Sequence, residues 1–430
     1  MMKEKRRADE KPALWLPYTQ MKTASPPLAA ARTEGCRIIL ADGRVLVDGT
    51  SSWWTACHGY NHPHIRRAVA AQLERMPHVM LGGLVHEQAA TLAERLAAVA
   101  PGDLAHVFFS ESGSVSVEIA MKIAIQYWLN RGRRRTRFLS FAHAYHGDTF
   151  AAMSVCDPDE GMHAHFAGAL AEQLVVPLPV GRNALADFDR TLARHAGDLA
   201  AVLLEPLVQA AGGMKFHNAE TLAGVAEAAR RHGVLLILDE IAVGFGRTGT
   251  LFACEQAEVV PDLMTLSKSL TGGTLPLAAT LARRHVFDAF WSDDAAHALM
   301  HGPTFTGNPL GCAAAHASLD LFEHEPRLAQ VARIEAALAE GLAPCRNASG
   351  VRDVRVKGAI GVVQLERAPG AAELDALRRR FVDEGVWVRP FGDVVYLMPP
   401  FVITDDELEV LTGAVRAVLA ERNWCQARFL

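Results

Sequence analysis

The chain has 430 residues, of which 50% are hydrophobic and 21% are charged, a balance typical of a globular protein with a sizeable core. Its formal net charge is −5, and the one basic cluster, Arg131–Arg135, contains no aromatic residue. We therefore expect no nucleic-acid partner.

Cysteine usage and hydropathy indicate a cytoplasmic protein. The 7 cysteines form no Cys-x-x-Cys pair and are odd in number, which favours a reducing compartment. The charged residues 1–11 are not followed by the apolar core of a signal peptide. No apolar run approaches the roughly 20 residues that span a bilayer, so we expect no contact with a membrane.

The N-terminal segment contains a predicted β-hairpin. Two β-rich runs within residues 37–48 flank Asp42-Gly43, a pair that favours a tight hairpin turn. A Trp-rich loop with Trp53 and Trp54 follows. Because neighbours on an extended chain point to opposite sides, we expect at least one of these two side chains to be buried. We assign residues 1–59 to an arm that forms part of a smaller lobe.

Residues 60–315 show the alternation of an α/β domain. Short apolar runs alternate with amphipathic segments such as Val115–Trp128, where apolar residues recur at helical spacing. This pattern predicts a mostly parallel sheet with helices on both faces. The predicted strands are His106–Ser110, Arg137–Phe141, Ala201–Glu205, Val234–Asp239 and Leu263–Ser267.

The pattern changes after residue 315. Two apolar runs at 386–391 and 394–401 flank Gly392-Asp393 and predict another hairpin-like unit. Thr404 and Glu407 have the spacing of a capping box that opens a last helix. We assign residues 316–430 to a small α+β domain that the N-terminal arm completes.

In an open parallel sheet, ligands bind beyond the carboxyl ends of the strands. Gly113 and Ser114 follow the first strand at the start of a helix, where free N–H groups favour an anion such as phosphate. The alternative is that Ser114 is only the N-cap. Tyr145 follows the second strand, where its ring could stack on a flat cofactor or be an ordinary half-buried tyrosine.

The last two predicted strands end in charged residues. Asp239 closes a wholly apolar strand, where a carboxylate needs a positive partner. Lys268 follows the fifth strand, and an apolar setting would lower the pKa of its amine and make it a nucleophile, although an isolated lysine is more often a surface residue. His143 and His146 lack a third ligand nearby, so we expect no metal.

A glycine pattern offers a rival interpretation. Gly244, Gly246 and Gly249 match the G-x-G-x-x-G spacing of dinucleotide-binding proteins. In that fingerprint the glycines follow the strand directly and open a helix, whereas here Asp-Glu-Ile-Ala-Val intervenes and no helical periodicity follows. We therefore interpret the glycines as a loop, and a nicotinamide-dependent oxidoreductase becomes the minor alternative. A further alternative is a binding protein without catalytic activity, but the presence of both Lys268 and Asp239 argues against it.

One cofactor accounts for all four strand ends. Pyridoxal phosphate has a phosphate, a flat ring, a ring nitrogen that must stay protonated and an aldehyde that condenses with lysine. The oxidoreductase interpretation explains only the glycine pattern and none of the four strand ends.

The same segments resemble a known family, the class III pyridoxal-phosphate aminotransferases of fold type I. The segments that carry the resemblance include SESGSVSVEIAMKIA, LLILDEIAVGFGRTGTLFACE, PDLMTLSKSLTGG and HGPTFTGNPL, and the similarity runs nearly end to end. One departure is Ala242-Val243, where the family commonly has a hydroxyl residue. The resemblance implies that Lys268 binds the cofactor covalently and that Asp239 pairs with its ring nitrogen. Gly113 and Ser114 would hold the phosphate, with Tyr145 over the ring.

The resemblance also implies a homodimer with shared active sites. Pro303 and Thr304 would reach the phosphate of the neighbouring subunit's cofactor, and Gly302 would line the substrate side. The substrate pocket would be shaped by Tyr18, Trp53, Trp54, Tyr145 and Lys268, with Arg389 on a substrate carboxylate and Arg247 near the substrate.

The implied reaction is amino transfer to 8-amino-7-oxononanoate with S-adenosyl-L-methionine as donor, giving 7,8-diaminononanoate for biotin synthesis. A different donor such as lysine, or another ω-amine, is the alternative.

Overall fold

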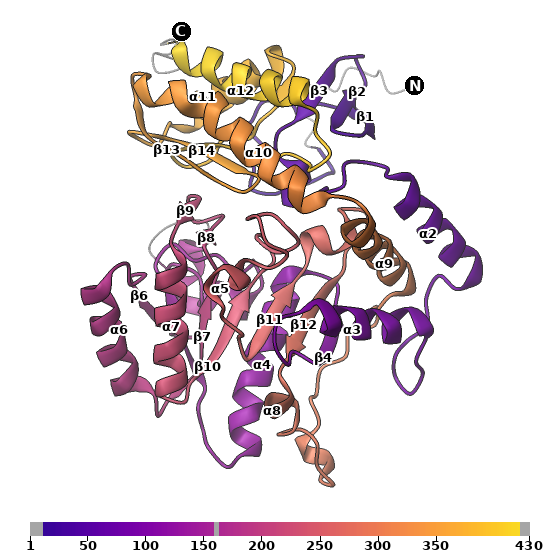
Figure 1. Ribbon diagram of the computed structural model, residues 1–430, viewed down its shortest axis with the longest axis vertical. Helices are drawn as coiled ribbons and strands as arrows, with labels where there is room; N and C mark the ends of the chain where they lie inside the picture. The colour runs from indigo at the N-terminus through magenta and orange to yellow at the C-terminus, as the bar shows by residue number, and fades with distance from the viewer. Residues whose placement is uncertain (1–11, 159–162, 422–430) are drawn as a thin grey trace.

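The structure, a computed structural model, describes residues 12–158 and 163–421, so the charged segment 1–11 and Cys425 lie outside the described residues. Its centre is a seven-stranded sheet in the order β4-β12-β11-β10-β7-β5-β6 (Figure 1). Only β12 runs antiparallel to its neighbours in this sheet of the described chain, which confirms the expected mostly parallel sheet. The strands are β4 (His106–Ser110), β5 (Arg137–Phe141), β6 (Leu174–Val176), β7 (Leu199–Leu204), β10 (Leu235–Asp239), β11 (Leu263–Leu266) and β12 (Ala278–Ala282).

Helices cover both faces of this sheet. Leu236 and Leu238 of β10 pack in the same cluster as residues of α6 (Arg182–His195) and α7 (Ala219–Arg231). Leu235 and Ile237, which point the other way, pack against α4 (Gly113–Asn130). Burial on both faces explains why the strands read as continuous apolar runs.

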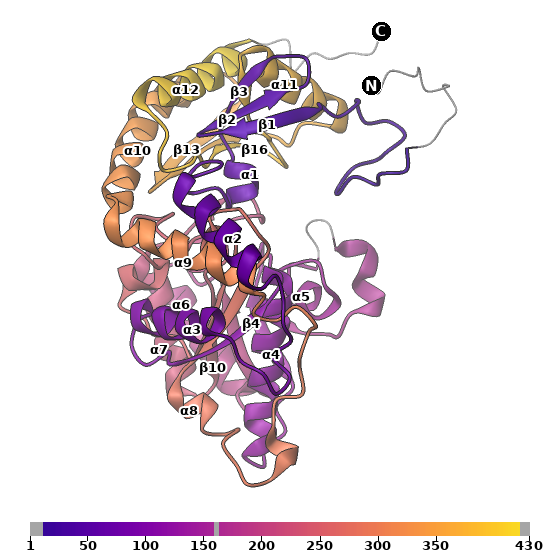
Figure 2. The same ribbon diagram turned by 90° about the vertical axis from the view of Figure 1, so that its right-hand side faces the viewer.

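Three more helices pack together, and the other elements around this sheet are short. α2 (Pro63–Arg75) packs on α9 (Pro309–His324), which also contacts α3 (Glu87–Val99), as Figures 1 and 2 show. The short elements are α1 (Ser51–Trp54), α5 (Phe150–Ser154), α8 (Arg284–Phe287), the 3₁₀ turns η1 (Ala164–Ala169), η2 (Ala253–Ala257), η3 (Lys268–Thr271), η4 (Ala295–His297) and η5 (Ala343–Asn347), and the two-stranded β8 (Val208–Gln209) and β9 (Lys215–Phe216).

The C-terminal part has its own core. An antiparallel sheet of β13 (Val351–Lys357), β14 (Ile360–Leu365) and β16 (Val394–Leu397) packs with α10 (Arg327–Leu342), α11 (Ala371–Asp383) and α12 (Asp405–Ala420). The capping box that opens α12 is confirmed, because the Thr404 hydroxyl accepts the Glu407 N–H and the Glu407 carboxylate accepts the Thr404 N–H.

The N-terminal strands join this part. The hairpin at Asp42-Gly43 is confirmed as β2 (Arg37–Leu40) and β3 (Val45–Asp48), and β1 (Ala30–Glu34) extends the same sheet. Its fourth strand is β15 (Val386–Trp387), which runs parallel to β3. Figures 1 and 2 accordingly show β1 to β3 beside α11 and α12. The domain boundaries after residues 59 and 315 stay a prediction.

The second predicted hairpin is wrong. β15 pairs with β3 and β16 pairs with β14, so the two runs belong to different sheets. Across the turn, only an isolated bridge joins Phe391 and Val394 in the described chain. Pro390 has no N–H to donate to a ladder, and this favours a crossing from one sheet to the other.

Within the described ranges, no helix combines the length and apolar character needed to cross a membrane.

Candidate active site

The predicted strand-end residues lie around one cavity of about 190 Å³. It is located where β10 and β11 end and where α4 begins, as expected for a mostly parallel sheet. Its lining contains six predicted residues and several that sequence analysis did not single out: Trp54, Gly113, Ser114, Tyr145, His146, Gly147, Asp148, Glu205, Ala211, Asp239, Ile241, Ala242, Ser267 and Lys268.

The start of α4 is suited to an anion. Its N-cap is Ser112, whose hydroxyl accepts the Val115 N–H at 3.4 Å, so the alternative that Ser114 is only a cap is wrong. The Ser114 hydroxyl lies 2.8 Å from the Thr149 hydroxyl and accepts the Thr149 N–H at 3.0 Å. The first N–H groups of a helix have no partner inside it, and Gly113 and Ser114 border the cavity.

A buried pair fixes the acid of β10. Oδ2 of Asp239 lies 2.7 Å from Nδ1 of His146, and both side chains are buried. Oδ1 accepts the Ile241 N–H at 3.1 Å and the Thr265 hydroxyl at 3.3 Å. The carboxylate is therefore held rigidly at the cavity wall. Sequence analysis considered His146 only as half of a metal pair, and the described residues contain no group of three or more His, Cys, Asp or Glu that could hold a metal ion.

Lys268 occupies an unusual backbone conformation for a non-glycine residue. Its φ is 45°, in the left-handed region that costs free energy and is found at functional sites. Its Nζ lies 5.0 Å from the centroid of the Trp54 ring. Burial lowers the pKa of the Lys268 ammonium, although Asp239 and Glu205 act in the opposite direction. A lowered pKa increases the fraction of neutral, nucleophilic amine.

Glu205 is a second buried acid at this site. It follows β7 directly, and its carboxylate accepts the Tyr145 N–H at 3.1 Å and the Ala210 N–H at 2.9 Å. Burial raises the pKa of Glu205 to about 7. Sequence analysis missed it, although an acid at the end of an apolar strand is the signal that identified Asp239.

The predicted substrate residues gather at the cavity mouth. The Tyr145 hydroxyl donates to Asp148 at 3.0 Å, and the Tyr18 hydroxyl donates to the other oxygen of the same carboxylate. The rings of Tyr18 and Trp53 meet edge to face, with centroids 6.1 Å apart. The Arg389 guanidinium lies 5.1 Å from the Trp53 ring centroid. Thus segments far apart in the chain form one rim.

The two tryptophans differ as expected. Trp54 is 7% exposed and Trp53 is 41% exposed, which confirms that at least one is buried. The reason given for this expectation is wrong, because the two residues have positive φ and are not in an extended chain. Arg389 follows β15 in an irregular segment instead of lying on a hairpin strand, because the predicted hairpin does not form. Its neighbour Val388 is buried while Arg389 is half-buried.

Besides Tyr18, Trp53 and Arg389 at the rim, three more predicted residues lie outside the lining of this cavity. Gly302, Pro303 and Thr304 belong to the connection between η4 and α9. The connection is anchored on both sides, because Lys122 donates to the Met300 carbonyl at 2.8 Å and the Thr306 hydroxyl donates to the Phe109 carbonyl at 2.6 Å.

Arg247 also lies outside the cavity lining. It is fully buried, donates to the Pro399 carbonyl at 2.8 Å and lies 4.5 Å from the Phe401 ring centroid.

The glycine pattern is a loop, as predicted. Residues 241–248 form consecutive turns, and Gly246 and Gly249 have φ values of 88° and 109°. The next element is the 3₁₀ turn η2. The segment therefore lacks the helix N-terminus that a dinucleotide pyrophosphate requires.

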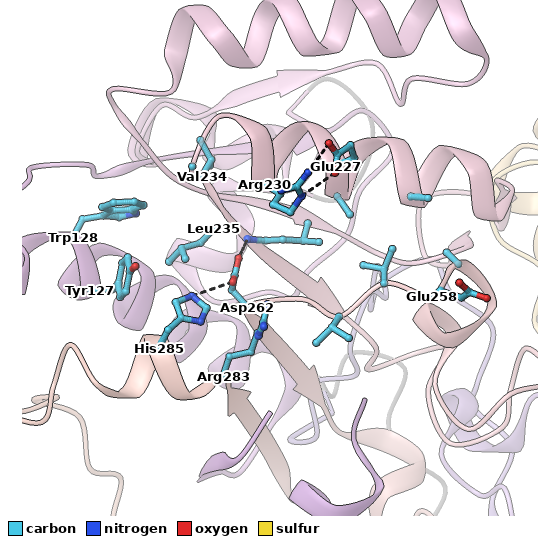
Figure 3. Close-up of a pocket in the computed structure, with 17 residues that line it drawn as sticks. Tyr127, Trp128, Glu227, Arg230, Val234, Leu235, Glu258, Asp262, Arg283 and His285 are labelled. Atoms are coloured by element: carbon cyan, nitrogen blue, oxygen red, sulfur yellow. Dashed lines mark hydrogen bonds and ion pairs between the residues drawn. The ribbon is translucent and has the colours of Figure 1, made fainter. Parts of the chain in front are cut away.

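A larger cavity, of about 550 Å³, lies where β10 begins (Figure 3). Two of its acids are paired with basic groups of the same lining: Glu227 lies 2.8 Å from Arg230, and Asp262 lies 3.2 Å from His285. Asp262 also accepts the Leu236 N–H at 2.8 Å. We place the candidate active site in the smaller cavity, because Lys268, Asp239 and the start of α4 meet there and Nε2 of the buried His146 has no hydrogen-bond partner among the described residues.

Comparisons with known proteins identify the family of the chain. The aminotransferase class-III family model matches residues 18–419. The adenosylmethionine-8-amino-7-oxononanoate aminotransferase of Corynebacterium glutamicum is 43% identical over 415 residues, covering 94% of this chain and 96% of that protein. The crystal structure of the protein of that name from Methanocaldococcus jannaschii has a TM-score of 0.90 at 33% identity, covering 95% and 96% of the two chains. A PLP-bound amine transaminase from an uncultivated Pseudomonas species has a TM-score of 0.88 at 32% identity, covering 96% and 99%. With a family match over nearly its whole length, the chain belongs to the class III aminotransferases.

Proposed function

We propose that the protein is a pyridoxal-phosphate-dependent transaminase that converts 8-amino-7-oxononanoate to 7,8-diaminononanoate, with S-adenosyl-L-methionine as the amino donor. The observation that carries the proposal is the convergence of Lys268, the Asp239–His146 pair and the start of α4 on one cavity. The names of the relatives from C. glutamicum and M. jannaschii support the choice of substrates.

The residues present fit pyridoxal phosphate. The N–H groups at the start of α4 would hold the phosphate, and Asp239 would hold the proton on the ring nitrogen. Tyr145 would lie over the ring, and Lys268 would bind the aldehyde carbon. When bound, the cofactor supplies an aldehyde that takes up an amino group and a protonated ring that accepts electrons.

The chain's own groups perform the proton transfers. Burial lowers the pKa of Lys268, which favours the neutral amine, and Nζ in that form would accept the proton that leaves the donor's α-carbon. Nζ would then hold that proton until it is delivered to a carbon of the cofactor. His146 keeps Asp239 oriented throughout, because its Nδ1 and the carboxylate are 2.7 Å apart.

The rim offers groups that would suit both substrates. Arg389 offers a planar fork that binds both oxygens of a carboxylate, which suits the acid end of the oxononanoate. Trp53 and Tyr18 present apolar ring surface to its carbon chain. Asp148 contributes a negative charge at the mouth, compatible with the cationic sulfonium of S-adenosylmethionine and equally with the ammonium of lysine.

We also propose a homodimer with shared sites. Gly302 and Thr304 are exposed in the single chain, and the anchored connection that bears them would extend to the neighbouring subunit's cofactor and substrate. A cytoplasmic location is part of the proposal, since the six described cysteines are free thiols.

Mass spectrometry of the reaction products tests the function. Purified protein loaded with pyridoxal phosphate is incubated with 8-amino-7-oxononanoate and either S-adenosylmethionine or lysine. We expect the diamine with S-adenosylmethionine. Formation only with lysine selects the alternative donor, and a colourless protein that binds NAD and forms no diamine refutes the proposal.

A further inference from the structure

The tryptophans of the rim are carried by a left-handed turn without a glycine. Ser51, Ser52, Trp53 and Trp54 have φ values of 49°, 47°, 56° and 74°. For residues with a Cβ, each such conformation is disfavoured because Cβ approaches the following carbonyl oxygen. Four in succession persist only where the surrounding structure over-determines them.

The Asp48 carboxylate supplies much of that restraint. Asp48 ends β3 and is fully buried. Its Oδ1 accepts the Thr50 N–H at 2.7 Å and the Thr50 hydroxyl at 2.9 Å. Its Oδ2 accepts the Ser52 N–H at 3.0 Å and the Tyr60 hydroxyl at 2.6 Å. Both oxygens are thus used to hold the turn and its flank, and four hydrogen bonds satisfy the buried charge.

The turn is also joined to the segments that bear the other site residues. The Gly49 N–H donates to the Trp387 carbonyl at 3.0 Å, two residues before Arg389. The Ser51 hydroxyl donates to the Met398 carbonyl at 2.7 Å. The Ser269 hydroxyl, next to Lys268, donates to the Trp54 carbonyl at 3.2 Å. These hydrogen bonds set the position of Trp53 relative to Arg389 and of Trp54 relative to Lys268. A change in the conformation of the turn therefore changes both positions.

We infer that Asp48 is a positioning residue for substrate selection: it acts through the left-handed turn to set Trp53 against Arg389 and Trp54 against Lys268. Asp48 itself does not line the cavity. The inference rests on the proposed function, because the proposed substrate is the ketone whose carboxylate and carbon chain these side chains would bind.

The test compares holoenzyme variants in steady-state kinetics. Asp48→Asn keeps the size and shape of the side chain, but its amide nitrogen cannot accept a hydrogen bond. The two hydrogen bonds to one of the carboxylate oxygens are therefore lost. We expect the KM for 8-amino-7-oxononanoate to rise about 10-fold or more while kcat falls less than about 3-fold. A merely structural role would reduce the amount of active enzyme and lower kcat without changing KM. Asp262→Asn, which also removes a carboxylate that accepts a backbone N–H, leaves both constants unchanged.

A second pair of variants isolates the left-handed conformation. Adding Ser52→Gly to Asp48→Asn removes the Cβ that opposes the turn, so we expect KM to recover at least about 3-fold. Adding Ser52→Ala to Asp48→Asn instead removes the same hydroxyl but keeps the Cβ, so we expect KM to stay as high as in Asp48→Asn alone. An unchanged KM in Asp48→Asn, or equal KM values for the two double variants, overturns the inference.

If Asp48→Asn does not fold, Tyr60→Phe removes one hydrogen bond to Asp48 and leaves the carboxylate in place. We expect a KM about 2- to 5-fold above wild type, and a wild-type KM overturns the inference. Failure of the proposed function is seen separately, as absence of diamine formation by the unmodified protein.

Discussion

Nδ1 of His146 and Oδ2 of Asp239 lie 2.7 Å apart inside the protein, and they connect the segment after β5 with the end of β10. Both side chains are buried, while His146 Nε2 has no partner among the described residues. One nitrogen of the imidazole therefore helps to orient the acid that would face the cofactor ring, together with the Ile241 N–H and the Thr265 hydroxyl.

Replacing His146 by alanine should weaken the site without unfolding the protein. A hydrogen bond to a charged group contributes about 1.5 to 3 kcal/mol, so we expect kcat or cofactor affinity to fall by about 10- to 100-fold. Fluorescence titration with pyridoxal phosphate and the rate of diamine formation measure the two effects. His195→Ala, at the end of α6 and far from the cavity lining, should match the unmodified protein. If both variants behave alike, His146 does not orient Asp239.

Lys268→Ala should abolish diamine formation while the melting temperature stays within a few degrees of the unmodified protein. The residue supplies the proposed nucleophile and proton carrier, and alanine leaves no amine in the cavity. Lys215→Ala, a change in β9 outside the cavity lining, is the control and should retain activity. Borohydride treatment followed by peptide mass analysis should locate the cofactor on the peptide with Lys268. A label on another lysine would show that the assignment is wrong.

Glu205 predicts a pH dependence of stability. Burial raises the pKa of Glu205 to about 7, above the ordinary value of a glutamate, so the folded state binds a proton that the unfolded state releases. Its contribution to the free energy of unfolding therefore falls as the pH rises from about 4.5 to about 7 and is constant above that range. Glu205→Gln should remove this part of the slope. Urea unfolding of cofactor-free protein at several pH values checks it, and parallel curves for the two proteins would contradict the raised pKa.

Arg389→Lys should raise the KM for 8-amino-7-oxononanoate by about 10- to 100-fold, since an ammonium cannot form the two parallel hydrogen bonds of a guanidinium. The maximal rate should change much less, because Arg389 does not line the cavity that contains Lys268. Arg355→Lys, at a guanidinium that donates to the Met214 carbonyl outside the cavity lining, is the matched control. An unchanged KM in Arg389→Lys would remove the residue from carboxylate binding.

The sheet could be predicted well from the sequence where burial on both faces imposes a continuous apolar run. β4 and β5 have the predicted bounds, and β10 and β11 differ by one residue. β12 was not predicted, because its sequence Ala-Ala-Thr-Leu-Ala is rich in a residue with low strand propensity. The expected hairpin after residue 386 failed because pairing partners are chosen by tertiary packing, and β3 and β14 offered better ones.

The site residues that lie at or just after the ends of strands could be predicted from the sequence. Their position after strands made Gly113, Tyr145, Asp239 and Lys268 candidates, and all of them line one cavity. Their roles came from the joint fit to one cofactor and from the family resemblance. The partnership of His146 with Asp239 joins distant parts of the chain, and no local pattern reports it. The left-handed turn at residues 51–54 was equally hidden, since it contains no glycine to indicate positive φ.

The parallel pairing of Val47 with Val386 has a consequence for biosynthesis. During translation the strand that contains Val47 leaves the ribosome long before its partner is made, and long-range pairings of this kind form slowly. The central sheet can close while the nascent chain is still growing. The first three strands can pair with one another early, but the outer edge of β3 must wait for β15. A ribosome that stalls before residue 386 therefore leaves that edge exposed to aggregation.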